Sequence, residues 1–190
     1  PKTSPRLTPI CQTAPRMTSN PPLPPERSSM LRVNLAGEYG AQCIYQGQLR
    51  VLKHHPCAPV LQEMLDQEAT HLRFFQQACV RERVRPSALS PLWYAAGHLL
   101  GMVTAAMGPK TAMACTMAVE TVIDQHYQEQ ILALPLNDPL RETLVQFQAE
   151  EREHHDTASA HHGHDAPGYP LLSAVIQTGS RLAIALAKRV

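Results

Sequence analysis

The sequence predicts an all-α protein built as a bundle of helices. Apolar residues recur at helical spacing in long stretches, prolines and glycines separate these stretches, and no alternating apolar–polar run of strand length stands out. Aromatic residues make up only 5% of the chain, which argues against a β-sandwich because strands favour aromatic side chains. At 190 residues the chain has the length of about one domain with a core of its own.

The first two helices are bounded by prolines. Leucine and isoleucine recur at helical intervals from Met30 to Lys53, and Pro56 closes that element. A second apolar-periodic run spans about 58–83 and ends before Pro86. We therefore expect two consecutive helices joined by a short connection.

Four more helices are expected, and the first three of them have a recognisable start or stop signal. Gly108-Pro109 ends the third helix and Pro135 ends the fourth. Asp138 is a suitable N-cap for the fifth, which fades into a stretch rich in His and Gly at 161–168. The expected ranges are about 90–107 for the third, 110–134 for the fourth, from near Pro139 for the fifth and 170–189 for the sixth.

Residues 1–29 differ in composition from the rest of the chain. They contain eight Pro and eight Ser or Thr with almost no apolar periodicity, so they cannot bury enough surface to offset the entropy of ordering. We expect a disordered Pro-rich tail that faintly resembles a transit peptide, because its cations outnumber its single acid. The sequence does not begin with Met, so we expect it to be either processed or incomplete.

Charge and cysteine content exclude some classes of function. Lys and Arg number 17 against 16 Asp and Glu, which excludes nucleic-acid binding driven by bulk positive charge. The five Cys are odd in number and form no Cys-x-x-Cys pair. This pattern argues against a disulfide scaffold and favours a reducing compartment.

The third and sixth helices are unusually apolar. No charged residue lies between Arg85 and Lys110, although the apolar run is shorter than a bilayer span requires. The sixth combines an apolar stripe with cations near its end, Lys188 and Arg189 among them. Two interpretations stay open for both: packing on the bundle, or lying in a membrane surface.

One pattern of carboxylates and imidazoles occurs twice along the chain. In each copy a lone Glu is followed, 30 or 31 residues later, by a Glu-x-x-His on the next helix. The second copy follows the first by 82 residues for the lone Glu and by 83 for the pair. The copies are Glu38 with Glu68 and His71, and Glu120 with Glu151 and His154.

This spacing suits a pair of metal ions. Residues three apart on a helix share a face, so each Glu-x-x-His offers a carboxylate and an imidazole to one ion. Four carboxylates and two imidazoles from four helices are the ligand set of di-iron bundles with a ferritin-like fold. Two divalent ions would neutralise four carboxylates whose convergence would otherwise be very costly. The sequence therefore predicts a ferritin-like four-helix bundle with two additional apolar or amphipathic helices.

The remaining candidates near this pattern receive supporting roles. We expect Glu150 to accept a hydrogen bond from the far ring nitrogen of His71, and Gln67 to hold the corresponding place for His154. His98 is expected to pack or to form hydrogen bonds, as is His126. The other histidines of this region are expected to be a solvated group: His155, His161, His162 and His164.

Several stretches resemble the demethoxyubiquinone hydroxylase family of ubiquinone biosynthesis, in family order and over essentially 30–190. One departure is Leu35, where the family commonly has His. That position is not among the six ligands, so the metal site is unaffected. The matching stretches are Leu31–Ala41, Asp66–His71, Arg83–Pro86 with Pro91–Trp93, Ala112–Thr116 with Val119-Glu120, His126-Tyr127 and Glu150–Asp156.

The resemblance implies that residues 30–190 form a ferritin-like di-iron monooxygenase domain. It implies hydroxylation of a demethoxy polyprenyl quinol, demethoxyubiquinol to demethylubiquinol, with O2 as co-substrate and two iron ions per chain. Glu68 and Glu151 would bridge the irons. One iron would be held by Glu38, Glu68 and His71, and the other by Glu120, Glu151 and His154.

The resemblance also implies partners and a location. We expect an external reductant, either reduced nicotinamide or the quinol, although no Gly-rich dinucleotide fingerprint is present. We expect a peripheral protein of the inner membrane, on the cytoplasmic side in a bacterium or the matrix side in a mitochondrion. Its substrate lies in that membrane, other ubiquinone-biosynthesis proteins are expected partners, and nucleic acid is not. His126 and Tyr127 are either an electron relay or substrate-side residues, or simply packed.

Three alternatives remain open at this stage. The ligands alone would permit an iron-storage module, although storage proteins need no helix that is apolar on all sides. A different di-iron oxidase is the second, either a quinol oxidase or a rubrerythrin-like peroxidase, but no Cys-x-x-Cys module is present. The third is a degenerate scaffold, against which the intact ligand set argues. Tail length, electron donor, oligomeric state and bacterial or mitochondrial origin are not determined by the sequence.

Overall fold

The computed structural model describes residues 25–189. Within that range the chain is helical and contains no strand, which confirms the predicted all-α class. The elements are α1 (Pro25–Leu52), α2 (Ala58–Glu82), α3 (Ser90–Ala106), α4 (Pro109–Ala133), α5 (Pro139–Ala160), the short 3-10 helix η1 (Gly163–Asp165) and α6 (Tyr169–Ala187).

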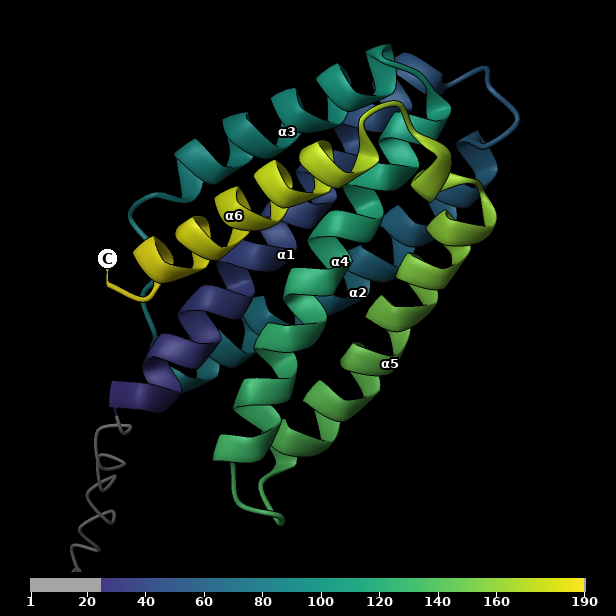
Figure 1. The fold of residues 1–190 in the computed structure, drawn as a ribbon. Helices are drawn as coiled ribbons and strands as arrows, with labels where there is room; N and C mark the ends of the chain where they lie inside the picture. Colours follow the sequence, from purple (N-terminus) through teal and green to yellow (C-terminus); the bar gives the residue numbers. More distant parts are fainter. Residues whose placement is uncertain (1–24, 190) are drawn as a thin grey trace, which may run out of the picture.

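Four of the helices form the bundle, as two hairpins. The short loop 53–57 joins α1 to α2, the short loop 134–138 joins α4 to α5, and α3 connects the two hairpins (Figure 1). Helices α1 and α4 meet along the middle of the molecule, while α3 packs on the outside of α1 and α6 on the outside of α4. This is the predicted four-helix bundle with two additional helices, with a single crossover between hairpins as in ferritin-like folds.

The start of α1 corrects the predicted boundary of the tail. The helix begins at Pro25, so residues 25–29 belong to it. The physical reason is Arg27, whose guanidinium donates to Glu82 at 2.8 Å and to Asp138 at 2.7 Å. These ion pairs attach the first turn of α1 to the end of α2 and the start of α5. The rest of the predicted tail, residues 1–24, lies outside the described residues.

The start of α5 follows its local sequence. The carboxylate of Asp138 accepts a hydrogen bond from the backbone N–H of Leu140 at 2.8 Å, which confirms the predicted N-cap. Such a cap satisfies one of the backbone donors that a helix leaves free in its first turn. Asp138 therefore stabilises the start of α5 and the contact with α1 at once.

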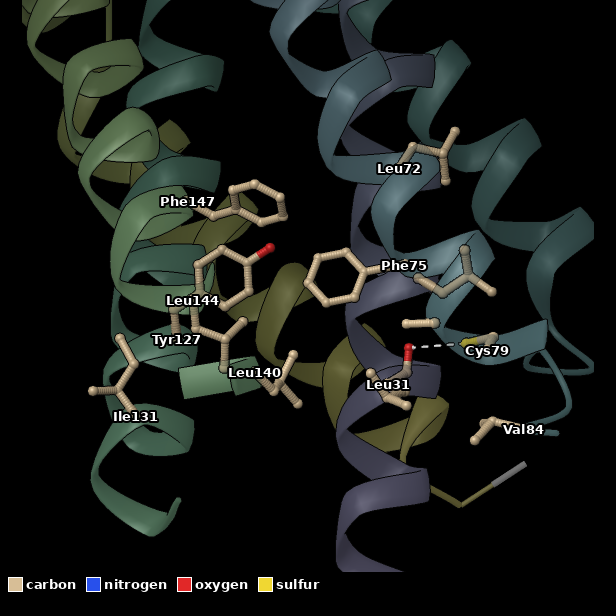
Figure 2. Packing of buried hydrophobic residues seen from close by; sticks show 12 residues of the cluster. Leu31, Leu72, Phe75, Cys79, Val84, Tyr127, Ile131, Leu140, Leu144 and Phe147 are labelled. Atoms are coloured by element: carbon tan, nitrogen blue, oxygen red, sulfur yellow. Dashed lines mark hydrogen bonds between the residues drawn. The ribbon is translucent and has the colours of Figure 1, made fainter. Parts of the chain in front are cut away.

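An aromatic cluster fills the bundle at the end where α1 begins. Figure 2 shows Phe75 from α2 facing Tyr127 from α4 and Phe147 from α5. The Phe75 ring centroid lies 6.4 Å from that of Tyr127 and 5.8 Å from that of Phe147. Leu35 belongs to the same buried cluster, so the residue that departs from the family's usual His serves as apolar packing here.

Glycines allow α3 to lie directly on α1. A Cβ added at Gly101 would sit 2.1 Å from the backbone oxygen of Ile44, and one added at Gly47 would sit 2.3 Å from the backbone oxygen of His98. No larger side chain fits at these positions without separating the helices. The close approach fixes the outer layer of α3 against the bundle.

Candidate metal centre

The structure brings all six predicted ligand residues together in the centre of the bundle. Each of the four bundle helices contributes, and every one of the six is at most 3% exposed. Their donor atoms form two groups, and within each group the atoms lie within 4.8 Å of one another. The groups are Glu38, Glu68, His71 and Glu151, and Glu68, Glu120, Glu151 and His154.

Both imidazoles aim the same nitrogen at the carboxylates. Nδ1 of His71 lies 3.1 Å from Oε1 of Glu151 and 3.7 Å from Oε2 of Glu38. Nδ1 of His154 lies 3.3 Å from Oε2 of Glu151 and 3.3 Å from Oε1 of Glu68. Glu68 and Glu151 therefore lie between the two halves, where a bridging ligand would stand.

The other ring nitrogens have the partners that the sequence predicted. Nε2 of His71 lies 2.5 Å from Oε2 of Glu150, and Nε2 of His154 lies 2.5 Å from Oε1 of Gln67. An Nε2–H that donates outward leaves the Nδ1 lone pair directed at the cluster, the usual arrangement of a metal-binding His. Phe147 stacks on the His71 ring, with centroids 4.0 Å apart, and further restricts its orientation.

Two buried tyrosines complete the surroundings of the site. The hydroxyl of Tyr45 donates to Glu120 at 2.7 Å, and that of Tyr127 donates to Glu38. The sequence analysis missed Tyr45 and left the role of Tyr127 open. The signal that could have found them was the repeat itself, since Tyr127 follows Tyr45 by the same 82 residues that separate Glu120 from Glu38.

Many polar atoms of this cluster have no hydrogen-bond partner in the protein. Burial without a partner costs about 1–3 kcal/mol for each such group, and more for a charged one. A cation among these atoms would remove that cost, so they indicate a bound metal. The unpartnered buried atoms are Oε2 of Glu38, both carboxylate oxygens of Glu68, Oε2 of Glu120, Oε2 of Glu151 and Nδ1 of His154.

In the metal-free protein, the close packing of the carboxyl groups raises the pKa values of some of them and lowers that of another. Burial, together with the charge of Glu151, raises the pKa of Glu68 well above its usual value, and the same two causes raise that of Glu120. Burial alone would raise the pKa of Glu151, but the imidazoles of His154 and His71 outweigh it and lower that pKa to about 2. Four carboxylates in one buried site therefore do not all ionise without a compensating cation.

The acidic surroundings raise the pKa values of both imidazoles. Burial alone would lower the pKa of His71, but the contact of its Nδ1 with Glu151 and the charges of Glu38 and Glu151 outweigh burial and raise the pKa to about 12. The pKa of His154 is also raised, because the charges of Glu151 and Glu120 outweigh burial. In the absence of metal, protons on these rings partly compensate the acidic cluster. A metal would have to displace those protons.

The donor set fits iron. Carboxylate oxygens with two imidazoles suit non-haem iron, and two divalent ions would balance four carboxylates. The shared position of Glu68 and Glu151 matches a carboxylate-bridged pair. The chemistry and the geometry of the residues are therefore consistent with two irons.

The histidines that were not predicted as ligands belong to neither ligand group. His126 is buried and its Nε2 lies 2.6 Å from the amide nitrogen of Gln130, which in turn pairs with Asn34. His126 thus forms hydrogen bonds, which is one of the roles that the sequence analysis expected for it. His98 is half-buried; His155 is half-buried and His161, His162 and His164 are exposed.

An apolar cavity of about 400 Å³ lies on the other side of α1 and α4 from the bundle interior. Residues of α1, α3, α4 and α6 line it, and they include Gly37 and Gly40, which flank the ligand Glu38 in sequence. A Cβ added at either glycine would meet nothing within 4 Å. The cavity therefore owes part of its volume to the two positions of α1 that carry no side chain.

Comparison with known proteins agrees with this site. The family model described as "Ubiquinone biosynthesis protein COQ7" matches residues 25–187. The NADPH-dependent 3-demethoxyubiquinone 3-hydroxylase of Mus musculus is 47% identical over 165 residues, which cover 84% of this chain and 76% of that protein. The 3-demethoxyubiquinol 3-hydroxylase of Rhodospirillum rubrum is 46% identical over 162 residues, with 84% and 76% covered.

A more distant relative shows the same match. The 5-demethoxyubiquinone hydroxylase of Saccharomyces cerevisiae is 41% identical over 179 residues, which cover 85% of this chain and 77% of that protein. The matched region contains both hairpins and therefore all six residues of the cluster. On this evidence the chain belongs to the COQ7 family of ubiquinone biosynthesis proteins.

Proposed function

We propose that this protein hydroxylates the benzoquinol ring of a demethoxy polyprenyl quinol, demethoxyubiquinol to demethylubiquinol, with O2 at a carboxylate-bridged di-iron centre. Family membership and the names of the relatives support the reaction. The single structural observation that carries it is the set of buried, unpartnered carboxylate oxygens shared between two groups of ligands.

The residues of the cluster have distinct parts in this proposal. Glu38 and His71 would hold one iron and Glu120 and His154 the other, while Glu68 and Glu151, which belong to both groups, would be shared between them. When bound, two ferrous ions supply two electrons to O2, so that one oxygen atom enters the ring and the other leaves as water. Each turnover would need two further electrons, and we infer reduced nicotinamide or the quinol as their source; a relative is named NADPH-dependent.

The protein contributes orientation and a dry environment. Glu150 and Gln67 hold the two imidazoles by their outward nitrogens, while Tyr45 and Tyr127 hold the two terminal carboxylates. Because these donors and acceptors are already in place, ligand geometry does not have to be reorganised when substrate arrives. The aromatic cluster beside His71 excludes water from that side.

The apolar cavity is the proposed place for the substrate. A polyprenyl tail is insoluble in water and fits a cavity lined by apolar side chains and glycines. The ring would reach the centre past Gly37, which is exposed and whose added Cβ would meet nothing within 4 Å. The cavity lies between the bundle and the two outer helices, so these helices control access to it.

The outer helices suit a membrane surface. Among the described residues, α6 is the one helix that is long and apolar enough to cross a membrane. Its most apolar 18 residues have a mean hydropathy of 1.3, and only 17% of them are buried. We infer that it lies in the interface, because Arg181 near its middle would be costly at the bilayer centre. The exposed apolar residues are Leu92, Tyr94, Leu99 and Val103 on α3, Met107 directly after it, and Leu171, Val175, Leu182 and Leu186 on α6.

This orientation defines the proposed location. The protein would be peripheral to the inner membrane, where its quinol substrate resides, and other ubiquinone-biosynthesis proteins would be its partners. The relatives from mouse and yeast are named mitochondrial, which supports the matrix side in a eukaryote; the cytoplasmic side is the bacterial counterpart.

Val175→Glu with Leu182→Glu should abolish sedimentation with anionic liposomes while the helical CD spectrum is kept. Unchanged sedimentation would contradict an interfacial α6.

Reconstitution with iron tests the reaction. Metal-free protein loaded anaerobically with Fe(II) should bind two irons per chain and convert demethoxyquinol to the hydroxylated product when O2 and a reductant are added. Glu120→Ala should abolish both iron pairing and turnover, whereas Glu153→Ala, an exposed carboxylate on the same bundle, should change neither. Ferric mineral without product would instead indicate iron storage.

A further inference from the structure

The two halves of the metal centre match in their ligands but differ in what holds each imidazole. The outward nitrogen of His71 meets the carboxylate of Glu150, whereas that of His154 meets the amide of Gln67, both at 2.5 Å. Glu150 and Gln67 occupy equivalent places, one residue before Glu151 and Glu68. A charged acceptor on one side thus replaces a neutral acceptor on the other.

The surroundings do not cancel this difference. The side chain of Glu150 is 30% exposed and receives one further hydrogen bond, from Gln146 at 2.9 Å. Among the described residues no Lys or Arg pairs with it; its one ion-pair partner is His71. The negative charge therefore acts on the His71 imidazole, and Phe147 stacks on that same ring.

A carboxylate that accepts the outward N–H makes a metal-bound imidazole a stronger donor. It draws the proton away from the ring and raises the basicity of the nitrogen that faces the metal, which an amide does less well. Changes at such outer partners alter metal affinity by about 10- to 100-fold. With ligands that otherwise match, the outer partners decide which position binds more tightly.

We infer that the two metal positions are inequivalent: the position of Glu38 and His71 binds its divalent ion about 10-fold or more tightly than that of Glu120 and His154. This rests on the di-metal centre of the proposed function. The centre then fills in a set order and loses the His154 ion first. Glu150 and Gln67 are positioning residues that determine this order.

Two reciprocal substitutions test the inference. Glu150→Gln gives both histidines an amide, and Gln67→Glu gives both a carboxylate. The double variant exchanges the two partners at constant net charge. Both sites are partly exposed, so the substitutions should leave the fold intact, which the CD spectrum checks. Stepwise dissociation constants are measured anaerobically with Co(II) against a chelator, with no substrate present.

The inference makes a distinct expectation for each protein. The wild type should show two Co(II) constants separated about 10-fold or more. The separation should shrink in Glu150→Gln because the tight site weakens, and in Gln67→Glu because the weak site tightens. It should return in the double variant.

The opposing results separate two failures. Repulsion between the two cations also separates the constants, but it would do so equally in all four proteins, and that result would overturn the inference while the metal centre stands. Binding of fewer than two Co(II) per wild-type chain would instead overturn the metal centre on which the proposed function rests.

Discussion

Tyr45 of α1 donates its phenolic hydrogen to Glu120 of α4 at 2.7 Å. Tyr127 of α4 returns the contact to Glu38 of α1. Both tyrosines are 1% exposed, so no bulk water competes for their partners. Burial, reinforced by the nearby carboxylates, raises the pKa of both phenols well above the usual value, and they therefore remain donors. The two hairpins are thus joined reciprocally through the terminal carboxylates of the metal centre.

Tyr45→Phe should weaken both the fold and the metal site. It removes a donor without changing shape and leaves a buried carboxylate oxygen unpaired, which costs about 1–3 kcal/mol of unfolding free energy. It should also lower metal affinity, because Glu120 is less well oriented. Urea unfolding and Co(II) binding measure the two effects.

A matched pair of variants gives the comparison. Tyr127→Phe should reproduce the losses through Glu38, while Tyr94→Phe, which alters an exposed phenol on α3, should change neither quantity. If Tyr45→Phe behaved like Tyr94→Phe, the contact would have no energetic role.

The fold was largely predictable because the residues that begin and end its helices act locally. Prolines and glycines bound the helices, and Asp138 signals the start of α5 without any distant partner. The start of α1 was not predictable in this way. Arg27 lies in a Pro-rich stretch and is held by residues 55 and 111 positions away. Composition cannot reveal such contacts.

The ligands were predictable for a different reason, and their surroundings only in part. The repeat places Glu38 and Glu120 in equivalent positions, so each copy supports the other. Tyr45 shares the repeat with Tyr127, but a tyrosine on a helix is most simply explained as packing. Its role depends on a hydrogen bond to another hairpin. The apolar cavity likewise requires four helices to be placed before it can be seen.

The contacts of Asp138 predict graded losses of stability. Asp138→Ala removes both the cap on Leu140 and the ion pair with Arg27, and should cost about 1–2 kcal/mol of unfolding free energy. Asp138→Asn keeps a capping oxygen and should lose only the smaller contribution of the partly exposed ion pair. Equal losses in the two variants, measured by urea unfolding, would mean that the cap contributes nothing.

Gly101 of α3 and Gly37 of α1 should respond to alanine in opposite ways. Gly101→Ala places a Cβ 2.1 Å from the backbone of Ile44, so α1 and α3 must separate at a cost of about 1–3 kcal/mol. Gly37→Ala meets nothing within 4 Å and should stabilise α1 by up to about 1 kcal/mol. Its methyl group would narrow the cavity, so KM for the quinol should rise even though the protein is more stable. A Gly37→Ala enzyme with unchanged KM would place the substrate elsewhere.

His126 should make the protein sensitive to mild acid. Burial, helped by the charge of Lys188, lowers the pKa of His126 from 6.5 to about 4, and the amide nitrogen of Gln130 donates to its unprotonated ring nitrogen. As pH falls below 6.5, His126 becomes protonated in the unfolded chain but stays neutral in the folded protein. The free energy of unfolding therefore decreases between pH 6.5 and about 4, and the loss is complete below that. The contribution amounts to about 3 kcal/mol. His126→Gln retains an acceptor but cannot titrate. Between pH 7 and pH 4 the metal-free variant should therefore lose about 3 kcal/mol less unfolding free energy than the metal-free wild type. Parallel pH curves for the two proteins would show that His126 is protonated alike in both states.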